Sequence, residues 1–299
     1  MSVHITGRTR LAGLVGWPLE HTLSPAMHNA VYEALGLDWV YVPLPLKDET
    51  DLLRFLGAAR VLPFVGFNVT MPYKQVMLSL CDEVAMLAKM AGAVNAVHVV
   101  DGRFIGYNTD GRGLTESLEI DAGFDPAGKE VVVVGAGGAA GAAIVSMILA
   151  KAKSVTVANR GAERAQELVD RMSAHARATE LSVAELGSES EERIRAADLI
   201  VNATPVGMKP DDPSPLPCDW LRAGQTVFDM VYGVGETVLV REARERGATA
   251  VDGLGMLVCQ GATAVDIWQD SAQVRTPRDV MRQAAERSLA EGNGEGGVR

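Results

Sequence analysis

A glycine-rich turn directly follows a run of four valines near the middle of the chain. The run 131–134 continues into Gly135-Ala-Gly-Gly-Ala-Ala140, a G-x-G-x-x-A pattern. The first glycine permits a tight turn, the second lets a pyrophosphate approach the backbone, and the small third residue allows a helix to pack closely on a sheet. The unpaired N–H groups at the start of that helix attract phosphate. Between a predicted strand and a predicted helix, the pattern indicates a dinucleotide site.

The residues that end the next predicted strand indicate which dinucleotide binds. Enzymes that use NAD carry Asp or Glu at this point, where the carboxylate binds the ribose 2′-hydroxyl. Here Asn159-Arg160 follows the strand, and Arg164 lies four residues further on. Two guanidinium groups can bind a 2′-phosphate through planar, charge-assisted hydrogen bonds. We therefore predict NADP. The alternative is two solvated surface arginines at an ordinary helix start.

Polar residues also gather at four places in the first part of the chain. Thr22 and Ser24 put two hydroxyl donors beside a predicted helix N-terminus, which suits a carboxylate. The alternative for Ser24 is a simple N-cap. The other three clusters are Gly66-Phe-Asn-Val-Thr-Met-Pro-Tyr-Lys74, Gly92-Ala-Val-Asn95-Ala96 and Gly106-Tyr-Asn108-Thr109-Asp110-Gly111.

Short apolar runs that alternate with helical segments predict an α/β protein with two domains. We predict strands at 11–16, 39–42, 64–69 and 93–100, with a helix that Ser24 caps and Pro25 begins. Further strands are predicted at 131–135, 155–159, 199–202 and 227–230, with helices at 139–150 and 162–174. Residues 1–110 are expected to form an N-terminal open α/β substrate domain, completed by helices within 253–299. Residues 111–252 are expected to form a Rossmann-like NADP-binding domain, with a deep cleft between the two domains.

The composition argues against several classes of protein. The 299 residues include 28 Lys and Arg against 38 Asp and Glu, a net charge of −10. Such a balance repels nucleic acid and anionic membranes. Three cysteines and five scattered histidines show no spacing typical of a disulfide framework or a metal site. The charge-free stretch 131–150 is long enough to cross a membrane, but its valines and glycine turn indicate a buried strand that leads into a helix. We expect a cytoplasmic protein without metal.

In their order along the chain, these motifs resemble the shikimate dehydrogenase family. The likeness covers nearly the whole chain and includes three later segments: Asn202-Ala-Thr-Pro-Val-Gly-Met208, Asp229-Met-Val-Tyr232 and Gly255-Met-Leu-Val-Cys-Gln-Gly261. The resemblance implies an NADP-dependent dehydrogenase that reversibly reduces 3-dehydroshikimate to shikimate, a step in the biosynthesis of aromatic amino acids.

The resemblance also implies a role for individual residues. Lys74 and Asp110 would form the catalytic pair, in which Lys74 donates a proton to the ketone oxygen and Asp110 positions its ammonium group. Thr22 and Ser24 would hold the substrate carboxylate. The other implied substrate-binding residues are Thr70, Asn95, Tyr232 and Gln260. The implied cofactor-binding residues are Gly135, Ala136, Gly137, Gly138, Ala139, Asn159, Arg160, Arg164, Thr204, Met230 and Gly253.

Two residues depart from the family pattern. Thr22 stands where many members have Ser, a choice associated with shikimate or quinate preference, and Pro205 stands where Ser often follows the Asn-Ala-Thr motif. One alternative is therefore a quinate/shikimate dehydrogenase of broader substrate and cofactor range. Another is a non-catalytic NADP-sensing regulator, against which the presence of both Lys74 and Asp110 argues. If the two residues had no catalytic role, Lys74 would be an exposed lysine at a helix start and Asp110 would be a helix N-cap. The sequence does not distinguish a monomer from a homodimer.

Overall fold

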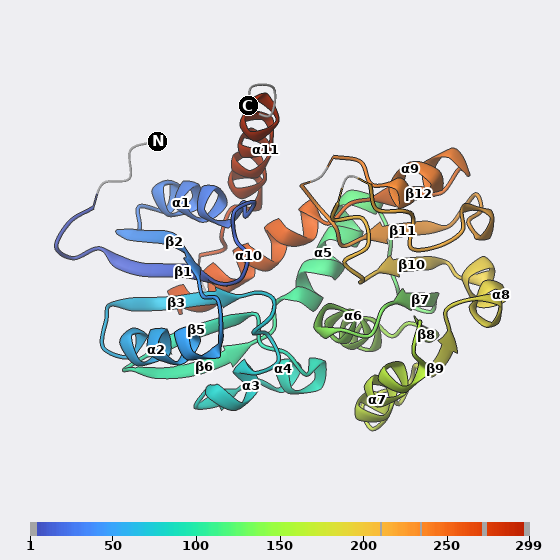
Figure 1. The fold of residues 1–299 in the computed structure, drawn as a ribbon, viewed down its shortest axis with the longest axis horizontal. Helices are drawn as coiled ribbons and strands as arrows, with labels where there is room; N and C mark the ends of the chain where they lie inside the picture. Colours follow the sequence, from blue (N-terminus) through green and yellow to red (C-terminus); the bar gives the residue numbers. More distant parts are fainter. Residues whose placement is uncertain (1–4, 210, 234, 271–273, 296–299) are drawn as a thin grey trace. The chain divides into compact units, whose positions relative to one another are not determined.

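The computed structural model describes residues 5–209, 211–233, 235–270 and 274–295 (Figure 1). The chain divides into two compact units. The first comprises Met1–Lys89, Ala93–Thr109 and Val258–Arg299, and the second comprises Met90–Gly92 and Asp110–Leu257. Each unit contains a six-stranded sheet with helices packed on it. The predicted α/β class, with one Rossmann-like sheet, is therefore confirmed.

The sheet of the first unit mixes parallel and antiparallel strands. Its order is β2-β1-β3-β5-β6-β4, in which β1 runs parallel to β2 and β3 while β5 runs antiparallel to β3 and β6. The strands are β1 (Arg10–Gly16), β2 (Trp39–Pro45), β3 (Phe64–Val69), β4 (Glu83–Val84), β5 (Ala96–Val100) and β6 (Arg103–Tyr107). Because β1 and β3 are parallel neighbours, the segments that follow them leave the same edge of the sheet.

The predicted strand at 93–100 is shorter than expected, and a following strand was not predicted. Residues 93–95 are irregular because Ala93 N–H returns to the Ala88 carbonyl and Val94 N–H donates to the Lys74 carbonyl. The unpredicted strand β6 joins β5 through Asp101-Gly102, both of which have positive φ, 50° and 73°. An Asp-Gly pair between strands is a strong hairpin signal, because both residues tolerate the left-handed conformation. That local signal was available in the sequence.

The helices associated with the first unit are α1 (Ser24–Leu35), α2 (Glu49–Ala59), α3 (Met77–Leu80), α4 (Met86–Ala91), α10 (Leu254–Gln269) and α11 (Arg278–Glu295). Helices α4 and α10 each continue into the second unit at one end. Helices α1 and α11 lie side by side (Figure 1). On α10, the Trp268 indole donates to the Val97 carbonyl at 2.9 Å and lies against Gly66 of β3. A Cβ at Gly66 would come within 2.2 Å of the indole nitrogen, so glycine lets α10 pack directly on the sheet.

The prediction that Ser24 caps α1 is wrong. Leu23 takes the cap position, and no side chain caps the helix. Ser24 is instead the first helical residue, with Pro25 in the first turn. Its backbone N–H donates to the Thr22 hydroxyl at 3.3 Å. The Ser24 hydroxyl is therefore not used for capping.

The sheet of the second unit is entirely parallel, with the order β12-β11-β10-β7-β8-β9. Its strands are β7 (Glu130–Val134), β8 (Ser154–Asn159), β9 (Glu180–Glu185), β10 (Leu199–Asn202), β11 (Thr226–Asp229) and β12 (Thr249–Val251). Numbered along the chain within this unit, the order reads 3-2-1-4-5-6 from β9 to β12, that of a dinucleotide-binding fold. The order reverses beside β7, so the carboxyl end of β7 is the topological switch point. Strands β9 and β12 were not predicted.

Helices cover both faces of this sheet. They are α5 (Asp110–Ala122), α6 (Gly138–Leu149), α7 (Ala162–Ser173), α8 (Ser188–Ala196) and α9 (Val238–Glu245), with a short 3₁₀ turn η1 (Cys218–Trp220). Val131 and Val133 of β7 pack in the core formed with α5, α6 and α7, whereas Val132 and Val134 pack in the core formed with α8 and α9. The valine run is apolar throughout because the strand is buried on both faces. Within the described ranges, none of the helices combines the length and apolar character needed to span a membrane.

Candidate active site

The glycine turn lies at the switch point of the second sheet. Strand β7 ends at Val134 because Gly135 adopts a φ of 109°, and a Cβ there would lie 3.0 Å from the Thr204 methyl group. Gly137 occupies the N-cap position of α6, with open space where a Cβ would stand. Ala140, in the first turn of α6, is fully buried. The first N–H groups of α6 are therefore approachable and free of a capping side chain, which suits a bound phosphate.

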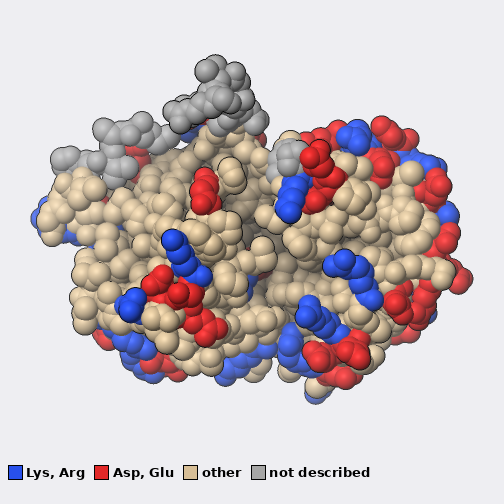
Figure 2. Space-filling model, in the orientation of Figure 1, with Lys and Arg blue, Asp and Glu red and all other residues tan. Residues whose placement is uncertain are grey.

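The two predicted phosphate-binding arginines follow the neighbouring strand. Asn159 ends β8, and its side chain donates to the Gly161 carbonyl at 2.8 Å, which shapes the turn into α7. Arg160 and Arg164 are exposed on either side of the start of α7, and neither forms an ion pair with a described residue. Figure 2 shows acidic and basic side chains interspersed over the face in view. An anionic ligand must therefore be held by such local groups rather than by the overall charge.

The remaining predicted cofactor residues follow strands on the other side of β7. The Thr204 hydroxyl, after β10, donates to the Asn202 side chain at 2.7 Å. Met230 directly follows β11. A Cβ at Gly253, which follows β12, would come within 2.3 Å of the Met230 carbonyl, so the two backbones approach as only glycine allows. Pro205 is exposed in the loop after β10.

In the first unit, a buried amide network joins residues from distant parts of the chain. Asn95, with 2% of its surface exposed, donates to the Thr109 hydroxyl at 2.9 Å and to the Gln260 side-chain oxygen at 3.2 Å. Its own side-chain oxygen accepts from the Thr109 N–H at 2.7 Å. These groups come from the loop before β5, the loop after β6 and helix α10. The structure therefore brings together two predicted substrate-binding residues, Asn95 and Gln260.

Sequence reasoning missed two residues of this network. Thr109, as described, bonds Asn95 directly. Asn68 lies in the fully buried strand β3, where it donates to the Asn95 carbonyl at 3.2 Å and accepts from the Tyr41 hydroxyl at 2.9 Å. An asparagine within an otherwise apolar strand is itself a signal, because a buried amide must find hydrogen-bond partners.

The predicted hydroxyl residues lie after β1 and β3, at one edge of the first sheet. Thr22 is half-buried and Ser24 buried in the segment that follows β1. Thr70 follows β3, and its N–H donates to the Val15 carbonyl at 2.8 Å. A Cβ at Gly16 would come within 2.3 Å of the Thr70 methyl group, so this glycine allows the two strand ends to approach.

Lys74 is not an exposed lysine at a helix start, as the alternative without a catalytic role would have it. It is half-buried in the turn 71–76, ahead of α3. Its carbonyl accepts from the Val94 N–H at 2.8 Å, which holds its backbone beside the residue that precedes Asn95. The turn is thus built into the same edge of the sheet as the amide network.

Asp110 is the first residue of α5 and is buried, with 4% of its surface exposed. Its charge acts on Tyr232 within the second unit. Burial raises the pKa of the Tyr232 phenol, and the Asp110 carboxylate raises that pKa further. The two residues, one at the start of α5 and one after β11, therefore share an environment. The Tyr232 hydroxyl stays protonated and available as a hydrogen-bond donor.

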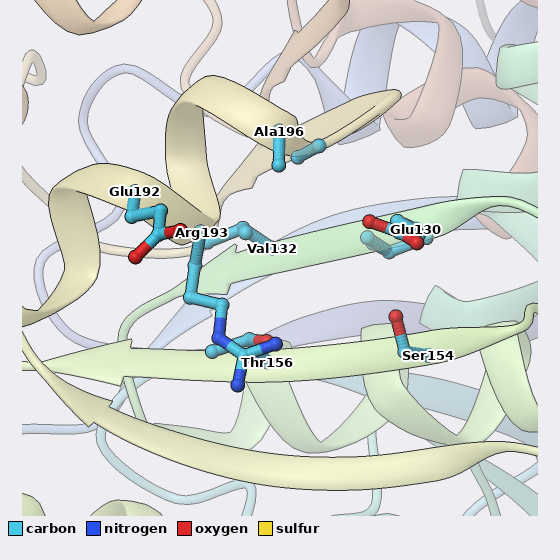
Figure 3. Close-up of a pocket in the computed structure, with 9 residues that line it drawn as sticks. Glu130, Val132, Ser154, Thr156, Glu192, Arg193 and Ala196 are labelled. Carbon is cyan, nitrogen blue, oxygen red and sulfur yellow. The ribbon is translucent and has the colours of Figure 1, made fainter.

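A separate cavity of about 300 Å³ lies elsewhere in the second unit (Figure 3). Residues from β7, β8 and α8 line it, among them Glu130, Ser154 and Arg193, and Figure 3 shows Arg193 extending from α8 over β8. Glu130 and Ser154 begin their strands, so the cavity lies toward the amino ends. Dinucleotides bind at the carboxyl ends of such strands, so this cavity is not the cofactor site.

Comparison with known proteins matches segments of both units to domains of one enzyme family. A family model described as the shikimate dehydrogenase substrate binding domain matches residues 14–97, and one described as shikimate / quinate 5-dehydrogenase matches residues 120–207. The shikimate dehydrogenase (NADP(+)) of Geobacter sp. (strain M21) is 43% identical over 287 residues, which cover 96% of this chain and 98% of the relative. The chain belongs to the shikimate dehydrogenase family.

Solved shikimate dehydrogenases share the fold over nearly the whole chain. A shikimate dehydrogenase crystallised with NADP+ superposes with a TM-score of 0.85 at 36% identity, covering 96% of this chain and 98% of that one. The enzyme from Thermus thermophilus, in complex with NADP(H) and shikimate, superposes with a TM-score of 0.82 at 35% identity, covering 93% and 99%. The range that the substrate binding domain model matches, residues 14–97, contains Thr22, Ser24, Thr70, Lys74 and Asn95.

Proposed function

We propose that this chain is an NADP-dependent shikimate dehydrogenase that reversibly reduces 3-dehydroshikimate to shikimate, a step in aromatic amino-acid biosynthesis. The observation that carries the proposal is the identity of 43% with a shikimate dehydrogenase (NADP(+)) over almost the entire length of both chains. The parallel sheet with its glycine turn and the buried amide network support it. The first unit serves as the substrate domain, and the second unit serves as the NADP domain.

The groups around the glycine turn fit NADP. The approachable N–H groups at the start of α6 suit a pyrophosphate, and Arg160 and Arg164 suit a 2′-phosphate. Gly135, Ala136, Gly137, Gly138, Ala139 and Asn159 shape this part of the site, and Thr204, Met230 and Gly253 contribute from the other side of the switch point. When bound, the nicotinamide supplies or accepts the hydride.

The residues of the chain handle the proton and the orientation of the substrate. Hydride delivery to a ketone develops negative charge on its oxygen, which requires a proton donor in the transition state. We assign that role to the ammonium group of Lys74, with the buried carboxylate of Asp110 positioning it and stabilising its charge. In shikimate oxidation the same lysine takes the proton back.

The remaining polar residues bind the substrate. Thr22 and Ser24 supply hydroxyl donors for its carboxylate, a role for which the Ser24 hydroxyl is available because it does not cap α1. Tyr232 adds a protonated phenol. Thr70, Asn95 and Gln260 bind ring hydroxyls. A ring hydroxyl both donates and accepts, so it can replace either amide partner in the Asn95–Gln260 bond.

None of the three cysteines forms a disulfide in the described part of the chain. A chain without disulfides suits a reducing compartment, which supports the cytoplasm as the site of action.

A spectrophotometric assay of NADPH formation tests the proposed function. Shikimate and quinate are each offered with NADP and with NAD. We expect the highest kcat/KM for shikimate with NADP. Comparable values for quinate would favour the broader quinate/shikimate dehydrogenase, and tight NADP binding without turnover of either acid would favour a regulator.

The pair of arginines should decide cofactor preference. Changing Arg160 and Arg164 together to alanine is expected to raise KM for NADP by about tenfold to a hundredfold, because charge-assisted contacts to the 2′-phosphate are lost at an exposed and therefore partly screened site. KM for NAD should change little, since NAD lacks that phosphate. Arg177, an exposed arginine outside α7, provides the control variant Arg177→Ala. An equal loss for both cofactors would contradict the assignment.

A further inference from the structure

A buried carboxylate and a buried amide meet at the carboxyl edge of the second sheet. Asp229 ends β11 and Asn202 ends β10; they pair in register and are both fully buried. The Asn202 amide donates to Asp229 Oδ1 at 2.9 Å, and the Val231 N–H donates to the same oxygen at 3.1 Å. The Thr237 hydroxyl donates to Asp229 Oδ2 at 2.7 Å. These donors compensate a charge whose burial is otherwise costly.

Asn202 holds the loop that follows its own strand. Its side-chain oxygen accepts from the Thr204 N–H at 3.1 Å and from the Thr204 hydroxyl at 2.7 Å, while its amide also donates to the Val206 carbonyl at 3.2 Å. With the bond to Asp229, the amide uses all its donors and acceptors. The side chain therefore determines the path of residues 203–206.

Asp229 holds the loop after β11 in the same way. Its bond to Val231 N–H spans Met230, whose own N–H donates to the Asn202 carbonyl at 3.0 Å. Its bond to Thr237 reaches the N-cap of α9, where Thr237 accepts from Val240 N–H at 3.3 Å. One buried pair thus sets the backbone that carries Thr204, Met230 and Tyr232.

The topology of the sheet indicates which half of the cofactor these loops face. A dinucleotide binds across the switch point, with one half on each side. Arg160 and Arg164 follow β8 on one side of β7, which places the 2′-phosphate and its adenosine half there. The nicotinamide half then falls on the side of β10 and β11.

We propose that Asn202 and Asp229 are positioning residues for hydride transfer: the buried pair holds the loops that orient the nicotinamide half of the cofactor and Tyr232. This inference rests on the proposed function. It separates two tasks within one sheet, because the β8 side determines cofactor affinity and preference while the β10–β11 side determines the geometry of the reacting half.

The test compares Asp229→Ala with Asp229→Asn, which preserves the shape and can still accept from Asn202 and Val231. Asp198→Asn is the matched control. Asp198 precedes the same strand β10 at the opposite edge of the sheet, where it accepts from the Glu130 N–H at 2.9 Å. Because small displacements of reacting groups cost up to about a hundredfold in rate, we expect Asp229→Ala to lower kcat by about tenfold to a hundredfold. The Kd for NADP and the preference for NADP over NAD should remain, and Asp229→Asn should recover most of kcat.

A second readout does not depend on activity. Amide hydrogen exchange in the protein without cofactor should become faster in segments 203–207 and 230–232 of Asp229→Ala, and remain unchanged there in Asp198→Asn. Where Asp229→Ala does not fold, the comparison of Thr237→Val with Thr237→Ser replaces it. The serine retains the donor to Asp229 and should preserve kcat, whereas the valine should lower it.

Two results would overturn the inference. One is an unchanged kcat in the folded alanine or valine variant. The other is a fall in kcat with a matching loss of NADP affinity and preference, which would mean general damage to the domain. Absence of shikimate turnover in the unmodified chain would instead refute the proposed function, and hydrogen exchange would then still show whether the pair holds the two loops.

Discussion

Replacing Lys74 by alanine is expected to lower kcat for shikimate oxidation by about 10²- to 10⁴-fold, the range that a positioned general acid or base contributes. The reason is the loss of the group that takes up the hydroxyl proton of shikimate, while the groups that bind both ligands remain. Lys74 is half-buried in a turn tied to the strand edge that carries the amide network, so removal of its side chain should not disturb the core. NADP affinity should persist, because the glycine turn and the arginines belong to the second unit.

The measurements are steady-state kinetics with shikimate and NADP, a direct titration of NADP, and a thermal melt to show that the variant is folded. Lys89→Ala is the control, since Lys89 is an exposed lysine of α4 in the same unit. It should retain full activity. Near-normal kcat in Lys74→Ala would remove Lys74 from the mechanism.

The second large effect concerns stability and pH. His28 is buried against aromatic rings, stacked on Tyr41 with ring centroids 4.0 Å apart, and the Tyr32 hydroxyl lies 3.3 Å from its Nδ1. Burial lowers the pKa of His28 from 6.5 to about 3. At a pH between about 3 and 6.5, the unfolded chain therefore binds a proton on His28 that the folded chain does not bind. As pH falls through this window, His28 should reduce the free energy of unfolding by about 1.4 kcal/mol per pH unit, or about 5 kcal/mol in all.

Denaturant titrations of the unmodified chain and of His28→Phe between pH 7 and pH 4 test this expectation. Phenylalanine keeps an aromatic ring against Tyr41 but cannot take up a proton. The free energy of unfolding of His28→Phe should fall less steeply with decreasing pH than that of the unmodified chain. The two slopes should differ by the contribution of one bound proton. His175→Phe, which removes an exposed imidazole, should follow the unmodified chain. Parallel curves for His28→Phe and the unmodified chain would show that His28 does not titrate on unfolding.

Local patterns were sufficient for much of the second unit. The valine run, the glycine turn and the helix after it form one short segment, and each feature depends on neighbouring residues: burial on both faces for the strand, a positive φ for Gly135 and small residues at the start of α6. The strands β8, β10 and β11 were predicted from their short, mainly apolar runs. Strand β9 has no such run and was not predicted, although its alternating polar and apolar residues are also a strand signal. On its polar face, Ser182 bonds Thr156 of β8 at 3.0 Å.

The first unit shows where local patterns fail. Ser24-Pro25 has the composition of a helix start, yet Leu23 takes the cap position and the Thr22 hydroxyl accepts the Ser24 N–H. Asn68 reads as an isolated polar residue in a strand until Tyr41 and the Asn95 carbonyl are seen beside it. Such partners come from other strands, so no spacing along the chain reveals them.

The amino-acid sequence by itself determined which chemical groups this protein has and where each lies relative to a strand end: the glycine turn, the arginines after β8, and the lysine after β3. The reason is that turns, caps and alternation depend on residues close together in the chain. Only the tertiary structure decided which of those groups meet. Asn95 and Gln260 are 165 residues apart, and Asn202 and Asp229 are joined only because β10 and β11 pair in register. Hydrogen bonds of that kind form when packing removes both partners from water, and packing is a property of the whole fold.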